Sequence, residues 1–128
     1  MIKILAAAGI VISTMALGAF VASAATPVPA TMGDTAKGKA WLDGKGMVLY
    51  TFAKDKTDKS NCNGPCAVEW PPLTVAAGAA ASGDWTIVAR DDGSKMWAFK
   101  GHPLYTFIDD KKPGEITGDG KDGFHLAM

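Results

Sequence analysis

The sequence predicts a small all-β or mainly β domain, built from two related antiparallel units and closed by one disulfide. Three observations favour this fold class: a strand-like motif that occurs twice, a single close pair of cysteines, and the lack of a long helical period after residue 24. The chain has 128 residues, which is the size of one domain. Hydrophobic residues make up 48% of it, enough for a packed core.

The charge balance excludes one class of function. The 13 Lys and Arg residues offset the 13 Asp and Glu residues, so the formal net charge is zero. Sequence-independent binding of nucleic acid needs a basic surface. We therefore expect no nucleic-acid partner.

Residues 1–24 are predicted to be a signal peptide. Lys3 gives a short positive start, an uncharged apolar run follows, and Ala22-Ser23-Ala24 fits a small-x-small cleavage site. The run approaches the roughly 18 residues that span a bilayer, so a membrane anchor is the alternative. Its Ala- and Gly-rich composition and the site directly after it favour cleavage, which leaves no stable membrane anchor. We expect a periplasmic or secreted bacterial protein.

The mature chain is predicted to have two parts. Residues 25–39 contain two prolines and two glycines with few large apolar side chains, so we expect a flexible lead-in. Residues 40–128 are expected to form a single β-rich domain. Its two repeats are placed at about 40–73 and 85–126.

A strand motif that occurs twice is the strongest feature of the chain. Residues 45–55 recur as residues 100–110 at a constant offset of 55, with seven identical positions. The shared Leu-Tyr-Thr-Phe core favours β-structure, and alternation along it places the Tyr and the Phe on one face. The shared Asp follows the strand, where its carboxylate can accept backbone N–H groups and close a turn. These positions are Tyr50, Phe52 and Asp55 in the first copy and Tyr105, Phe107 and Asp110 in the second.

The second unit is predicted to be a three-strand meander. Its strands cover residues 85–90, 95–100 and 103–107, and Asp-Asp-Gly-Ser at 91–94 forms the first turn. Gly101-His102 is expected to form the second turn.

The remaining segments are less regular. The first unit is predicted to have strands over 40–42 and 47–52. Residues 75–82 fit a short helix or a loop, and the glycines there weaken the helix. The Gly-rich segment 114–123 fits a loop, and residues 124–126 fit a last short strand.

Cys62 and Cys66 are the only cysteines of the chain. In an oxidising compartment such a pair forms a structural disulfide, which is our first interpretation. A redox centre is one alternative, although three residues rather than two separate the cysteines. A soft copper site is the other, with both thiolates, His102 or His125, and Met side chains as ligands. We expect no cofactor, and copper is the alternative.

A family resemblance follows from these motifs. Both copies fit the pattern Y-x-[FWY]-x-x-D, and the segment Cys-Asn-Gly-Pro-Cys-Ala-Val-Glu-Trp-Pro-Pro-Leu at 62–73 lies between them. The chain resembles a bacterial family of predicted lipoproteins and secreted proteins named for that repeat, over about residues 37–126. The resemblance implies an exported β-rich domain whose biochemical role is not established, with no catalytic residues to carry over. Many relatives have a lipobox cysteine, and its absence from this chain favours a soluble form.

The lack of an assembled catalytic motif favours a non-enzymatic protein over an enzyme. We expect a cell-envelope module that binds an envelope protein or a small ligand. The second hypothesis is a periplasmic redox or copper-handling protein that uses Cys62 and Cys66. The third is a hydrolase with Asp55 and Asp110 as acid and base, although their repeat-equivalent positions favour a turn role for both. The aromatic side chains either form the core or stack on sugars or peptides.

Overall fold

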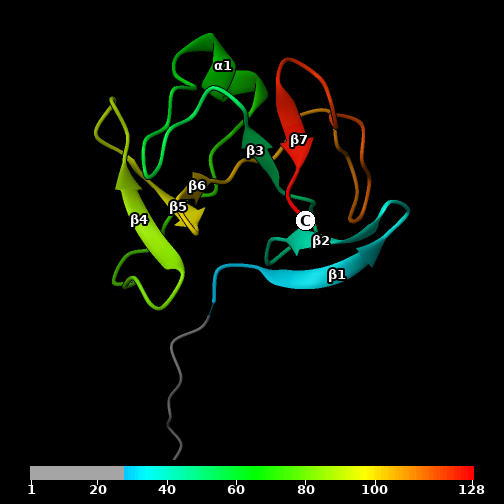
Figure 1. Ribbon diagram of the computed structural model, residues 1–128, viewed down its shortest axis with the longest axis horizontal. Coiled ribbons are helices and arrows are strands. Elements are labelled where there is room, and N and C mark those ends of the chain that lie inside the picture. The colour runs from blue at the N-terminus through cyan, green and yellow to red at the C-terminus, as the bar shows by residue number, and fades with distance from the viewer. Residues whose placement is uncertain (1–27) are drawn as a thin grey trace, which may run out of the picture.

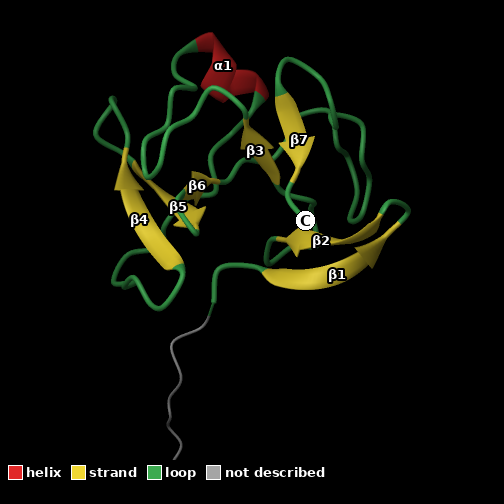
Figure 2. Ribbon diagram, in the orientation of Figure 1, coloured by secondary structure: helices red, strands yellow, loops and turns green. Residues whose placement is uncertain are grey.

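The computed structural model describes residues 28–128, and the predicted signal peptide over 1–24 lies outside the described residues. Within them the regular secondary structure consists of short strands and one short helix, joined by long loops (Figures 1 and 2). No helix between residues 28 and 128 is both long and apolar enough to cross a membrane. In chain order the elements are β1 Thr31–Thr35, β2 Gly38–Leu42, β3 Tyr50–Phe52, α1 Pro65–Glu69, β4 Trp85–Ala89, β5 Lys95–Phe99, β6 His102–Pro103 and β7 Phe124–Leu126.

The strands form small antiparallel sheets. β1 pairs with β2, β4 pairs with β5 and then β6, and β3 pairs with β7. Figure 1 shows β7, near the C-terminus, lying beside β3 from the first half of the chain. The predicted mainly β fold with two repeat-like units and one disulfide is therefore confirmed.

Matching hydrogen bonds show that the two repeats are related by an approximate two-fold rotation. The amide of Trp41 bonds to the carbonyl of Ala127 at 2.9 Å. At the equivalent place in the other repeat, the amide of Trp97 bonds to the carbonyl of Leu73 at 2.9 Å. The β1–β2 hairpin corresponds to the β4–β5 hairpin, because the carbonyls of Trp41 and Trp97 each accept the amide of the leucine in the motif strand that follows.

Each repeat contributes its last segment to the other repeat. β7 ends the second repeat and pairs with β3 of the first. Residues 69–73 end the first repeat and run beside residues 104–108 of the second, with the Thr106 amide bonded to the Pro71 carbonyl at 2.8 Å. The two motif strands meet at Tyr50 and Tyr105, which exchange backbone hydrogen bonds of 2.7 and 2.9 Å. Neither repeat is complete without its partner.

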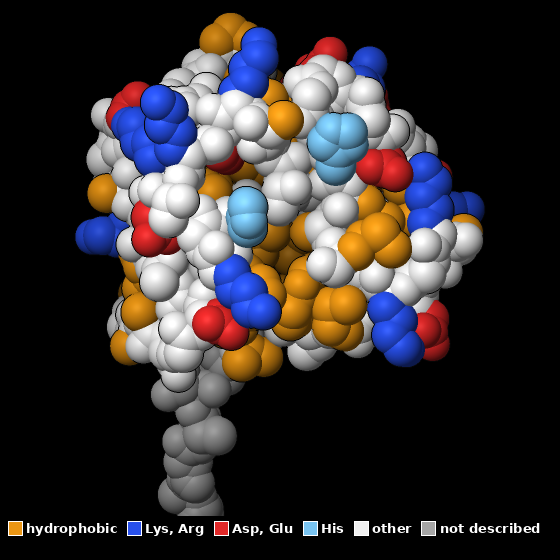
Figure 3. Space-filling view, in the orientation of Figure 1, with side chains coloured by type: hydrophobic (Ala, Val, Ile, Leu, Met, Phe, Trp, Pro, Cys, Tyr) orange, Lys and Arg blue, Asp and Glu red, His pale blue; other side chains and the backbone are white. Residues whose placement is uncertain are grey.

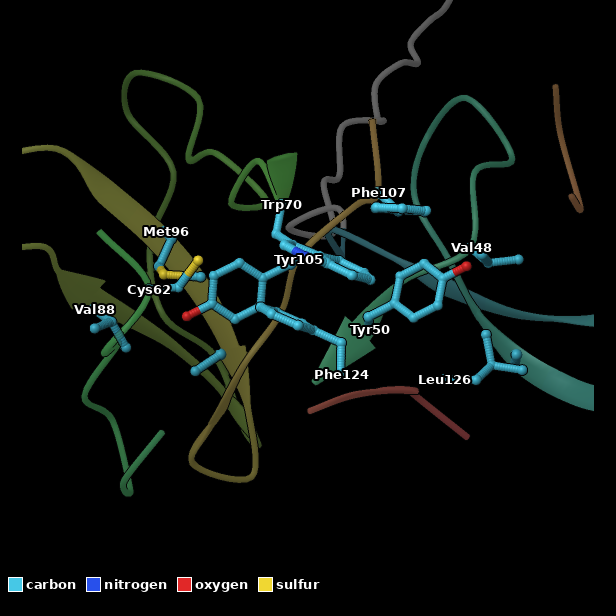
Figure 4. Close-up of a cluster of buried hydrophobic side chains, with 12 residues drawn as sticks. Val48, Tyr50, Cys62, Trp70, Val88, Met96, Tyr105, Phe107, Phe124 and Leu126 are labelled. Atoms are coloured by element: carbon cyan, nitrogen blue, oxygen red, sulfur yellow. The ribbon is translucent and has the colours of Figure 1, made fainter. Parts of the chain in front are cut away.

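Two hydrophobic clusters lie on opposite faces of the motif strands. The first contains the motif tyrosines and the second contains the leucines that precede them, as strand alternation predicts. Figure 4 shows the first cluster. Its buried members include Tyr50, Cys62, Trp70, Met96, Tyr105, Phe107 and Phe124, and those of the second include Leu49, Trp85, Trp97 and Leu104.

The flexible lead-in predicted over 25–39 is wrong at residues 31–35, which form β1. The first repeat therefore begins at about residue 31 rather than residue 40. The segment is mostly exposed and contains Gly33 and Asp34, so neither hydrophobicity nor β-propensity identifies it. A Cβ at Gly33 would meet the end of the Leu42 side chain, which packs over this strand.

Three smaller expectations also differ from the structure. His102 lies in β6 rather than in a turn, and Lys100 and Gly101 form the turn with φ values of 51° and 84°. The regular strand predicted over 103–107 is limited to β6, followed by isolated bridges at Tyr105. Residues 75–82 are a loop, and the short helix α1 is an element that the sequence pattern does not predict.

Candidate functional site

Each motif tyrosine is hydrogen-bonded to the motif aspartate of the other repeat. The Tyr50 hydroxyl donates to Asp110 Oδ2 at 2.7 Å. The Tyr105 hydroxyl donates to Asp55 Oδ2 at 2.6 Å. Both tyrosines are fully buried in the first cluster. The motif residues therefore join the two repeats to each other.

The second oxygen of each aspartate binds the loop that follows it. Asp55 Oδ1 accepts the Asn61 amide at 2.7 Å. Asp110 Oδ1 accepts the Thr117 amide at 2.9 Å and the Thr117 hydroxyl at 2.6 Å. Both oxygens of each carboxylate therefore have donors within the protein. These contacts give both aspartates a part in holding the fold together.

Burial raises the pKa of both motif tyrosines. For each hydroxyl the removal from water is the largest cause, and the neighbouring carboxylate, Asp110 or Asp55, adds to it. Burial also raises the pKa of Asp55, while the Tyr105 hydroxyl and the Asn61 amide act in the opposite direction. The tyrosines consequently remain protonated donors at neutral pH.

Four aromatic rings are stacked where the two repeats meet. Phe52 stacks on Phe124 with ring centroids 4.2 Å apart, and Phe124 stacks on Trp70 at 3.9 Å. Trp70 in turn stacks on Phe107 at 4.1 Å. Such pairs contribute about 0.5–1.5 kcal/mol each beyond the burial of their area. The motif phenylalanines therefore form part of the core.

A buried polar cluster surrounds the cysteine loop. The side chain of Arg90 is 2% exposed. Its Nη1 donates a hydrogen bond to Ser60 Oγ at 3.0 Å, and its Nη2 donates one to the Cys62 carbonyl at 2.8 Å. Nη1 also lies 3.5 Å from Met96 Sδ. The Ser60 hydroxyl is 2.6 Å from the Tyr105 hydroxyl, which connects this cluster to the tyrosine–aspartate pair. We define these residues, with Cys66, as the Arg90 cluster.

The disulfide between Cys62 and Cys66 is present, so the first interpretation of the cysteines is confirmed. Cys62 is fully buried, and Cys66 is half-buried at the start of α1. Pro65 opens this helix, a position where its missing N–H costs nothing. None of the helix residues is buried, and Val68 is 69% exposed. The helix therefore covers one side of the disulfide with little packing of its own.

An aromatic hollow of about 350 Å³ opens on the face that carries β6 and β7. Figure 3 shows this face, with both histidines at its surface and a hollowed group of hydrophobic side chains below them. Trp41 and Phe99, whose ring centroids are 4.7 Å apart, supply its aromatic wall. The hollow is also lined by Thr51, His102, Leu104 and Leu126.

A larger hollow of about 700 Å³ occupies the equivalent place in the other repeat. Trp97 lies there as Trp41 does in the first hollow, but it is only 5% exposed. Asp43 occupies the place in the larger hollow that Phe99 occupies in the aromatic hollow. Alanines of residues 76–80 also line the larger hollow. The larger hollow therefore offers little aromatic surface.

The two histidines lie apart from the cysteine pair. Both are exposed, and His102 lines the aromatic hollow while His125 sits on β7 with Nδ1 3.9 Å from Asp119 Oδ1. Between residues 28 and 128, no group of three or more His, Cys, Asp or Glu side chains is placed to hold a metal ion. The cysteine–histidine combination considered from the sequence is therefore not assembled in this structure.

A family model described as a secreted repeat of unknown function matches residues 31–74 and again residues 86–125. The chain belongs to this family. The two matched stretches begin at β1 and close to the start of β4, which are the equivalent first strands of the repeats. Membership in the secreted-repeat family supports an exported location and leaves the biochemical role unestablished. No curated protein and no solved structure matches the chain.

Sequence reasoning did not identify the Arg90 cluster or the aromatic hollow. One signal for the cluster is present, because Arg90 is the single arginine among the 13 basic residues. A buried cation favours arginine over lysine, since the guanidinium is less strongly hydrated and has five donors in a fixed geometry. The hollow has no comparable signal, because its walls come from both repeats.

Proposed function

We propose that this member of the secreted-repeat family is a non-enzymatic binding module of the bacterial cell envelope, exported to the periplasm or beyond by its N-terminal segment. Its binding site is the aromatic hollow, and its ligand is a small molecule with a flat apolar ring and a hydrogen-bond acceptor. The observation that carries the proposal is the half-buried aromatic wall formed by Trp41 and Phe99 in a hollow of about 350 Å³.

The size and walls of the hollow favour a small ligand. Small-molecule sites range from about 300 to 1,000 Å³ and are mostly apolar, with a few polar groups that fix orientation. Leu104 and Leu126 supply apolar walls beside the two aromatic rings. A flat ring gains area and favourable ring contacts against such surfaces.

The polar groups at the rim favour a ligand with an acceptor. Thr51 contributes a hydroxyl and His102 contributes a ring N–H, and both line the hollow. Phenols and quinones combine a flat ring with oxygen acceptors. We therefore choose 2-naphthol and the naphthoquinone menadione as probes.

Titration of the folded protein with each probe, followed by amide chemical shifts in NMR spectra, tests the proposal. We expect saturable shifts at Thr51, His102 and Leu126. The H102A variant should bind about fivefold more weakly, because one net hydrogen bond is worth about 1 kcal/mol.

The H125A variant is the matched control, since His125 is equally exposed on the same side and does not line the hollow. It should bind the probes as the unmodified protein does. Shifts that never saturate, or that map to residues 76–80 instead, would contradict the proposal.

A further inference from the structure

A comparison of the two repeats distinguishes features that both share from features that only one has. The shared features are those that the fold requires. Both repeats use the tyrosine–aspartate pairs, the stacked rings and the exchanged last segments. The loop from Asp110 to Phe124 is one residue shorter than the loop from Asp55 to Trp70 and contains no cysteine. The second loop therefore supports its tyrosine–aspartate pair and its stacked ring without a disulfide.

The Arg90 cluster departs from the symmetry at several positions together. Cys62 follows the residue whose amide binds Asp55, and Gly118 holds the corresponding place after Thr117. Met96 directly precedes Trp97, and Ala40 holds the equivalent place before Trp41 in the other repeat. A disulfide, a buried thioether and a buried guanidinium have thus been added at one place on a scaffold that forms without them.

Two sulfur-containing residues of the cluster, Cys62 and Met96, contact the same guanidinium. Met96 makes its contact through Sδ at 3.5 Å, and Cys62 makes its contact through its carbonyl at 2.8 Å. Figure 4 shows the side chains of Cys62 and Met96 adjacent in the first cluster. Both are fully buried, and Cys66 is joined to Cys62. Three sulfur donors therefore lie within one small region.

The charge of the region favours an anionic group. Within residues 28–128, the nearest carboxylate contact of the Arg90 guanidinium is a single one of 3.9 Å, from Nε to Asp92 Oδ1. The same Nε has no hydrogen-bond partner in the described part of the chain. A buried cation without a close counter-ion is costly, so a neighbouring negative charge would be stabilised.

We propose that Cys62, Cys66 and Met96 form a redox-gated site for a soft monovalent cation, Cu(I), which binds when the disulfide is reduced. Thiolates and thioethers are the ligands that Cu(I) prefers. The third donor is the buried Met96 rather than either histidine. This site is separate from the aromatic hollow.

The chemistry balances with an external dithiol. A dithiol protein gives two electrons and two protons to the Cys62–Cys66 bond and is itself oxidised to a disulfide. Binding of Cu(I) then releases the two thiol protons and leaves a complex of net charge −1. The charge of Arg90 offsets it. The reductant reaches the half-buried Cys66 first, because Cys62 is fully buried.

Reduction should leave the protein folded. The chain-entropy model assigns a disulfide that closes so short a loop roughly 2 kcal/mol. The Asp55 contacts and the stacked rings remain after reduction. A reduced, metal-free protein that unfolds in circular dichroism would overturn the proposal.

The test is an oxygen-free titration of the reduced protein with Cu(I), in competition with the chromophoric chelator bathocuproine disulfonate. We expect one Cu(I) per chain and three sulfur neighbours in X-ray absorption. The M96L variant should show two sulfur neighbours and at least tenfold weaker binding. The oxidised protein, and the double variant C62S/C66S, should bind no Cu(I).

Matched controls distinguish this donor set from others. M32L makes the same change at an exposed methionine of β1 and should bind as the unmodified protein does. H102A and H125A should also leave affinity unchanged. Absence of binding by the reduced protein, equal affinity in M96L, or a loss in either histidine variant would overturn the proposal.

Discussion

The hydroxyl of Tyr50 lies 2.7 Å from Asp110 Oδ2, so the tyrosine of the first repeat is paired with the aspartate of the second. The opposite pair, Tyr105 with Asp55, is equally close at 2.6 Å. Because the partners come from different repeats, the motif holds two units together. This relationship gives direct predictions about stability.

The pairing across repeats can be measured with a double-mutant cycle. Y50F removes the donor to Asp110 and should destabilise the protein by about 1–3 kcal/mol, since a buried carboxylate oxygen loses its partner. Combined with D110A, it should show a coupling of about 0.5–3 kcal/mol in urea unfolding.

The same cycle with D55A is the control. Asp55 belongs to the same repeat as Tyr50 and bonds instead to Tyr105. We expect the effects of Y50F and D55A to add within about 0.5 kcal/mol. Coupling in the within-repeat pair, with none in the cross-repeat pair, would contradict the structure.

Tyrosine ionisation should coincide with alkaline unfolding. The chain has two tyrosines, Tyr50 and Tyr105, and burial raises the pKa of each above its ordinary value of 10.0. A pKa that is higher in the folded state gives stability that is complete below the unfolded value and is lost as the pH rises through the folded value. We expect absorbance at 295 nm to rise in one step, together with loss of circular dichroism, above pH 10.

A tyrosine that ionises with a midpoint near 10 while the dichroism stays native would disprove this expectation. Y105F should halve the amplitude of the step.

Neither repeat should fold alone. Residues 28–78 lack β7, which pairs with β3, and residues 79–128 lack the segment 69–73. Each separate fragment should show no cooperative thermal transition. An equimolar mixture should recover β-sheet dichroism and form a 1:1 complex in ultracentrifugation. A cooperative transition in either single fragment would show that the exchange of segments is not required.

Gly118 should tolerate no side chain. A Cβ there would lie 2.6 Å from Trp70 Cη2 and 2.8 Å from Phe107 Cδ2, inside the ring stack. We expect G118A to lower the free energy of unfolding by about 1–3 kcal/mol, the usual cost of overpacking. G44A is the matched control, because a Cβ at Gly44 meets no atom within 4 Å. Equal stability of the two variants in urea would contradict this packing.

The sequence predicts the strands and their alternation well, because these depend on local pattern. Tyr50 and Leu49 face different clusters, as the period of two requires. The disulfide is also predictable, since the chain offers a single pair. β1 is not predictable in this way, because its ladder with β2 rather than its own composition makes it a strand.

The partners of the motif residues could not be assigned from spacing. A tyrosine five residues before an aspartate is compatible with a bond inside its own repeat or across to the other. The exchange of last segments brings the motif strands together at Tyr50 and Tyr105. This exchange is what makes each tyrosine bond to the aspartate of the other repeat. The aromatic hollow depends on the same three-dimensional exchange, because Trp41 and Phe99 come from different repeats.

The pairing of β3 with β7 also sets the order in which the chain becomes structured. The partner strand of β3 is synthesised more than seventy residues after it. Contacts between residues so distant along the chain slow folding, because the entropy of closing a long loop is lost before the contacts stabilise the structure. The ladder of β3 can therefore be completed only after the last strand of the chain is available.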